Sequence, residues 1–126
     1  MSCRRSTLAL VAVNGTHLFY EAGGRGAPVV LLHAGNLDSR MWDPQFARLA
    51  REHRVIRYDL RGFGGSGSAD TPFRHDEDLG TLLDSLRLDR VSLVGASGGG
   101  RVAIDFTLAH PQRVAIQKLA HTNVWL

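Results

Sequence analysis

The sequence has a single cysteine, no long hydrophobic run and no block of like charge. One thiol cannot form an internal disulfide, so Cys3 indicates a reducing compartment, and we expect a cytoplasmic protein. The apolar stretch 8–13 follows Arg4 and Arg5 but is shorter than the ~7–15 residues of a secretory signal core. No stretch is long enough to span a membrane. We therefore expect no membrane partner.

The charged and metal-ligating residues also lack the patterns that nucleic-acid and metal sites require. The net charge is +3, but the arginines are scattered and do not interleave with aromatic residues, so nucleic acid is not an expected partner. The six histidines show no paired spacing and have no cysteine pair beside them, so no metal and no cofactor is predicted. With 126 residues and 44% hydrophobic content, the chain suits one globular domain.

Extended and helical patterns alternate along the chain. Asn14-Gly15 predicts a hairpin turn between strands 8–13 and 16–21. Asp43 and Pro44 are typical of the N-cap and first position of a helix. Further strands are predicted at 29–33, 55–59, 90–94 and 113–120, with helices after Asp43, around 79–86 and at 101–109. Strands separated by helices predict a mostly parallel sheet with helices on both faces.

The pentapeptide G-A-S-G-G, residues 95–99, carries the clearest chemical signal. It has the form G-x-S-x-G and follows the apolar run V-S-L-V, and a helical pattern comes directly after it. This order of strand, sharp turn and helix presents a nucleophilic serine, here Ser97. The alternative is a glycine-rich turn that contains an incidental serine. The flanking periodicities favour the nucleophile.

A second glycine pattern, formed by Gly62, Gly64 and Gly67, spells the G-x-G-x-x-G dinucleotide fingerprint after a strand. That motif requires a helix to begin on the glycines, so that free N–H groups hold the pyrophosphate. Here helical periodicity begins only near His75, after an intervening segment that contains Pro72. The spacing therefore argues against a nucleotide site.

Several blocks in order resemble one family. They are V-V-L-L-H-A-G, M-W-D-P-Q, R-V-I-R-Y-D-L-R-G-F-G-G-S, L-V-G-A-S-G-G-G and H-P-Q-R-V. Together they make the chain similar to the N-terminal half of an α/β-hydrolase. M-W-D-P-Q, R-Y-D-x-R-G and A-H-T-N-V-W-L most resemble the 3-oxoadipate enol-lactonase group. The resemblance implies a β-hairpin followed by a mostly parallel sheet with helices on both faces, in one domain over residues 1–126.

The resemblance also implies roles for individual residues. Ser97 matches the nucleophile, and the N–H of Gly98, at the start of a helix, would stabilise the oxyanion of its intermediate. A second N–H would come from Gly35, because H-A-G-N matches the family's H-G-x-x with Ala34 as a departure. Asn36 lies next to that donor. For His33 we favour a bracing role in this loop over a catalytic one.

A serine nucleophile needs a base and an acidic partner for that base, and this sequence does not supply them at the positions usual for the family. In the family they follow the serine in the order Asp or Glu, then His, whereas here only Asp105, His110 and His121 follow Ser97. Asp105 lies i+4 from Arg101, which favours a helical ion pair. We therefore expect the usual acid and base beyond Leu126, in a truncated chain.

The resulting expectation is a serine hydrolase that acts on an ester or lactone. The alternative is an inactive fragment, or a remnant that binds a small molecule or a partner. Truncation would leave the strand predicted at 113–120 with an unpaired edge. We therefore also expect self-association through that edge.

Overall fold

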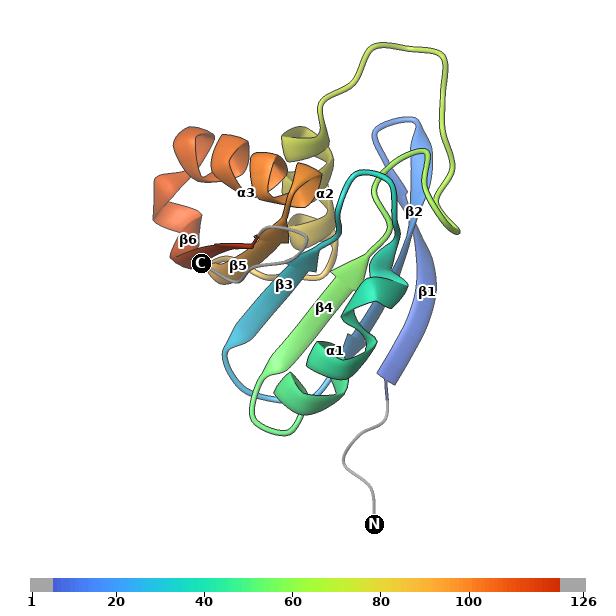
Figure 1. Ribbon diagram of the computed structural model, residues 1–126. Helices are drawn as coiled ribbons and strands as arrows, with labels where there is room; N and C mark the ends of the chain where they lie inside the picture. The colour runs from blue at the N-terminus through green and yellow to red at the C-terminus, as the bar shows by residue number, and fades with distance from the viewer. Residues whose placement is uncertain (1–5, 121–126) are drawn as a thin grey trace.

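The computed structural model describes residues 6–120 of the chain, which form one six-stranded sheet in the order β1-β2-β4-β3-β5-β6 (Figure 1). Strands β3 to β6 run parallel to one another, and β2 pairs antiparallel with β1 and β4. The strands are β1 (Ser6–Val13), β2 (Thr16–Gly23), β3 (Pro28–Leu32), β4 (Arg54–Tyr58), β5 (Val91–Ala96) and β6 (Val114–Ala120). The predicted hairpin and mostly parallel sheet are confirmed.

The β1–β2 hairpin turns on the two residues that the sequence indicated. Asn14 and Gly15 both have positive φ, 46° and 88°, the combination that a two-residue type I′ turn requires. Val13 pairs with Thr16 across this turn, and the pairing continues without a break to Ser6 and Gly23. Both strands are longer than the alternation predicted.

Helices cover both faces of the sheet (Figure 1). Helices α2 (His75–Ser85) and α3 (Gly98–Ala109) pack on one face, and α1 (Asp43–Leu49) packs on the other. Two short 3₁₀ segments, η1 (Ser39–Trp42) and η2 (Pro111–Arg113), precede α1 and β6.

The start of α1 differs from the prediction. Asp43 is not an N-cap but the first residue of the helix, because η1 leads directly into α1 at Trp42. The capping carboxylate belongs instead to Asp38, which accepts the N–H of Arg40 at 2.9 Å and caps η1. The Asp43 side chain accepts a hydrogen bond from Arg57 on β4.

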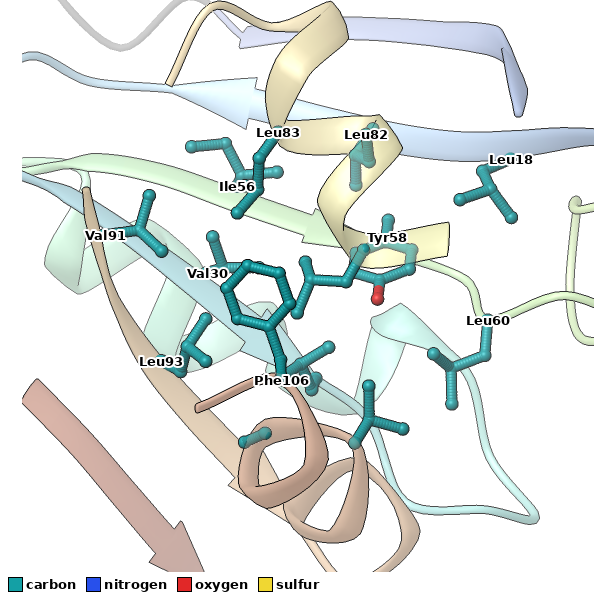
Figure 2. Close-up of a cluster of buried hydrophobic side chains, with 14 of the residues drawn as sticks. Leu18, Val30, Ile56, Tyr58, Leu60, Leu82, Leu83, Val91, Leu93 and Phe106 are labelled. Carbon is teal, nitrogen blue, oxygen red and sulfur yellow. The ribbon is translucent and has the colours of Figure 1, made fainter. Parts of the chain in front are cut away.

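The fully apolar β3 run V-V-L-L contributes side chains to the hydrophobic cores on both faces of the sheet. Successive strand residues point to opposite faces, so Val30 and Leu32 join the core under α2 and α3, whereas Val29 and Leu31 join the core under α1. Figure 2 shows the larger core, in which Phe106 of α3 and the leucines of α2 point toward the strands. A central strand buried on both faces explains why its sequence shows no alternation.

Candidate active site

Ser97 occupies the single residue between the end of β5 and the start of α3. Its φ of 51° lies in the left-handed region, which is uncommon for a residue with a side chain, and its side chain is exposed. Its N–H donates to the Ala120 carbonyl at 3.0 Å, and its carbonyl accepts the N–H of Arg101 at 3.1 Å. The backbone of Ser97 is therefore bound on both sides, to β6 and to α3.

The glycines on either side of Ser97 are required by close backbone contacts. A Cβ added to Gly95 would lie 2.6 Å from the carbonyl oxygen of Gly99. A Cβ added to Gly99 would lie 2.5 Å from the carbonyl oxygen of His33 and closer still to that of Leu32. These approaches leave no room for a side chain, so the G-x-S-x-G spacing follows from how tightly the end of β5 packs against the start of α3 and the start of α3 against the end of β3.

The same turn brings Gly98 against the loop that follows β3. A Cβ added to Gly98 would lie 3.1 Å from both the nitrogen and the Cα of Gly35. Gly98 is the first residue of α3, where backbone N–H groups have no partner within the helix. Among the described residues, no acceptor takes the N–H of Gly35 or of Gly98. Two residues predicted to act together therefore lie side by side, next to Ser97.

His33 is fully buried and holds two loops together. Its Nδ1 lies 2.7 Å from the Ala34 carbonyl oxygen, and its Nε2 accepts the N–H of Leu60 at 2.9 Å. A carbonyl can only accept and an N–H can only donate, so these partners assign the proton to Nδ1. Both ring nitrogens are occupied, which leaves no lone pair to take a proton from Ser97.

A buried carboxylate that the sequence analysis left without a role braces the same loops. Asp59 accepts the N–H of Ser39 through Oδ1 and the N–H of Gly65 through Oδ2, both at 2.8 Å. A Cβ at Gly64 would collide with this carboxylate. The signal available in the sequence was a lone aspartate directly after a buried strand and before a glycine-rich loop.

A cavity of about 610 Å³ opens between the loops after β3 and β4, beginning one residue beyond Gly35. This volume suits a small organic molecule. At its edge Arg40 forms an ion pair with Asp38 at 2.8 Å, and the hydrogen bond from Arg40 lowers the pKa of that carboxyl. The lining residues are Asn36, Leu37, Asp38, Arg40, Met41, Gly62, Phe63 and Gly64.

The acid and base candidates that follow Ser97 are not assembled around it in the described part of the chain. Asp105 pairs with Arg101 at 3.5 Å on the surface of α3. His110 lies past the opposite end of α3 from Ser97, which at ~1.5 Å per residue is about 20 Å away. His121 lies outside the described residues.

The glycines of G-x-G-x-x-G do not open a helix. The N–H of Gly62 donates to the Gly67 carbonyl at 2.9 Å, and a Cβ at Gly67 would lie 2.6 Å from Thr16 Oγ1 on β2. Helix α2 begins only at His75. This loop therefore folds back on the hairpin, away from the arrangement that holds a pyrophosphate.

Over residues 6–120 the structure shows no cluster of three metal-ligating side chains. None of the helices in that part of the chain has the length and apolar character needed to cross a bilayer.

Comparison with known proteins agrees with this geometry. Residues 27–116 match the family described as alpha/beta hydrolase fold. The chain is 35% identical to the serine hydrolase BPHL of Mus musculus, over 95% of this chain and 44% of that protein. It is 31% identical to a 2-hydroxy-6-oxo-6-(2'-aminophenyl)hexa-2,4-dienoic acid hydrolase of Metapseudomonas resinovorans, over 82% of this chain and 38% of that protein. The crystal structure of an epoxide hydrolase from Vigna radiata superposes with a TM-score of 0.85 at 26% identity, over 90% of this chain and 39% of that one.

The chain therefore belongs to the α/β-hydrolase fold family, and the predicted fold class is confirmed. Both of these curated relatives are named as hydrolases. The chain spans about two fifths of the length of these relatives.

Proposed function

We propose that Ser97 is the nucleophile of a hydrolase that cleaves an ester or lactone bond. The observation that carries the proposal is the position of Ser97, exposed at a strained turn with the N–H groups of Gly98 and Gly35 beside it. Left-handed backbone at a residue with a side chain costs on the order of 1–3 kcal/mol, and such strain is concentrated at functional sites. Its relative BPHL is itself named a serine hydrolase.

The chemistry follows from this arrangement. The Ser97 Oγ attacks the carbonyl carbon as a base takes its proton, and the carbonyl oxygen becomes an oxyanion. The N–H groups of Gly35 and Gly98 donate to that oxyanion, and the positive end of the α3 dipole adds to the stabilisation. The base then returns the proton to the leaving oxygen, so collapse of the intermediate releases the alcohol, or opens the lactone, and leaves an acyl-serine for water to hydrolyse.

The ester or lactone class rests on the resemblance of M-W-D-P-Q and R-Y-D-x-R-G to enol-lactonases. The hydrolase relatives support hydrolysis in general and not that particular bond. The substrate would enter the cavity beside Asn36, between the loops that His33 and Asp59 hold in place. The general base is not among the described residues near Ser97. For the 126-residue chain we therefore expect slow acylation by activated reagents and little turnover.

The test is labelling of the purified chain with a fluorophosphonate, followed by mass spectrometry of its peptides. We expect the adduct on Ser97, its loss in Ser97→Ala, and full retention in Ser68→Ala, which removes an exposed serine from a loop. An oxyanion site alone can retain ~10³–10⁴-fold acceleration over water, so labelling within hours is expected.

An adduct that survives Ser97→Ala would overturn the assignment of the nucleophile. Absence of any adduct, with the fold intact by circular dichroism, would favour the alternative of a remnant that binds a small molecule. A ligand that binds such a remnant should shift the amide NMR signals of Asn36 and Phe63 without acylating the chain.

A further inference from the structure

Strand β1 is an open edge of the sheet without the features that usually protect such an edge. Within residues 6–120 it has β2 as its one neighbour, so half of its backbone N–H and carbonyl groups face outward. Its sequence, S-T-L-A-L-V-A-V, contains no charge and no proline, and its pairing with β2 has no bulge. Edges of this length and composition pair readily with another strand.

The outer face of β1 adds exposed apolar surface to this edge. Leu8 and Leu10 are 61% and 60% exposed and, being two residues apart, point to the same face. Across the hairpin they face Glu21 and Phe19. The Glu21 carboxylate accepts a hydrogen bond from Ser6 Oγ at 2.6 Å and forms an ion pair with Arg57, so its charge is already partnered within the same copy.

We propose that β1 is a docking surface for a second copy of this chain, through antiparallel pairing of two β1 strands about a two-fold axis at Ala9. In that register Leu8 of each copy lies opposite Leu10 of the other, on the same face of a sheet that continues through both copies. In an isologous contact the same surface of both copies meets, so that surface must be complementary to itself. An uncharged strand meets this condition because it brings no like charges together, even though each copy has a net charge of +3.

The opposite edge of the sheet suits a second copy less well. Strand β6 exposes Ile116, which is 66% exposed, but it also carries Lys118, the kind of residue that keeps strand edges apart. Two β6 strands related by a two-fold axis would bring two lysines into one small interface. The charge pattern therefore favours β1 as the site of self-association, in place of the 113–120 edge expected from the sequence.

The first test is sedimentation velocity of the chain between 1 and 100 μM, on the order of the concentrations at which weak dimers form. We expect a dimer that Leu10→Lys dissociates, with its dissociation constant raised at least about tenfold because two cross-strand contacts are lost. The matched variant Ile116→Lys, on β6, should leave the dimer intact. Both positions are exposed, so both variants should keep the wild-type circular dichroism spectrum.

A monomer at all concentrations would overturn the proposal, and so would a dimer that Ile116→Lys disrupts and Leu10→Lys does not. A cross-link gives an independent test of register. In the variant Cys3→Ser/Ala9→Cys, the two cysteines would face each other with Cα atoms ~4.5–5.5 Å apart, within disulfide range. The control Cys3→Ser/Ala12→Cys places its cysteines about 20 Å apart in the same register and should not cross-link.

Discussion

The Nε2 atom of His33 accepts the backbone N–H of Leu60 at 2.9 Å, and this bond joins the loop after β3 to the loop after β4. Both loops line the cavity that begins one residue beyond Gly35. The Asp59 carboxylate makes a second connection between the same loops, from the residue next to Leu60. The walls of the candidate site are therefore held by buried polar contacts, with the glycines of the site free to present their N–H groups.

Replacing the imidazole should loosen these loops. In His33→Phe the buried N–H of Leu60 loses its acceptor, and leaving such a group unsatisfied costs about 1–3 kcal/mol. We expect a lower free energy of unfolding in urea and faster amide hydrogen exchange at Leu60. The control His110→Phe replaces an exposed imidazole and should change neither quantity. Unchanged exchange at Leu60 in His33→Phe would contradict the bracing role.

The buried ion pair of Arg61 and Asp78 gives a larger expected effect. The guanidinium donates to both carboxylate oxygens at 2.9 Å, and both side chains are at most 2% exposed. Asp78→Ala should destabilise the fold by about 3–5 kcal/mol, because it leaves a buried charge unpaired. Asp84→Ala, which removes a 69% exposed partner of Arg113, should cost less than about 1 kcal/mol. Urea unfolding of the two variants tests the difference.

Adjacent glycines of the elbow should respond in opposite ways to a methyl group. A Cβ at Gly99 would collide with the carbonyls of Leu32 and His33, so Gly99→Ala should destabilise the fold by about 1–3 kcal/mol or more. A Cβ at Gly100 would lie 3.4 Å from the Gly95 carbonyl oxygen, an ordinary contact. Gly100→Ala should therefore be neutral or stabilise by up to ~1 kcal/mol, as alanine favours helix. Thermal unfolding of both variants measures the contrast.

Local patterns predicted the parts of the fold that depend on neighbours in sequence. Asn14-Gly15 predicted the hairpin because only residues that tolerate positive φ fit its turn. G-A-S-G-G predicted the junction of β5 and α3 because the backbone there excludes a Cβ at Gly95 and Gly99. These requirements are visible in a few consecutive residues.

Contacts between distant residues could not be predicted in the same way. Asp59 binds the N–H of Ser39, and Arg61 reaches Asp78 and the carbonyl of Asn14, each across a long stretch of chain. Such pairs depend on the strand order, in which β4 lies between β2 and β3 against the order of the sequence. Asp43 shows the same limit, because its side chain is directed to Arg57 by the sheet and not by the helix that it begins.

The stability of the fold should fall as the solution is acidified below neutral pH, through His75. Burial lowers the pKa of His75, Asp78 opposes this and Arg61 adds to it, and among the described residues no partner takes its Nδ1. The unfolded chain therefore binds a proton at a higher pH than the native chain does, starting near the ordinary value of about 6.5. The contribution of His75 to stability is fully present above that value, and it is lost as the pH falls toward the lowered native pKa.

We expect the free energy of unfolding of the wild type to decrease between pH 7.5 and 5.5. In His75→Gln the decrease over the same pH range should be smaller. His17→Gln, at an exposed position, should keep the wild-type slope. Identical slopes for His75→Gln and the wild type would contradict this origin of the pH dependence.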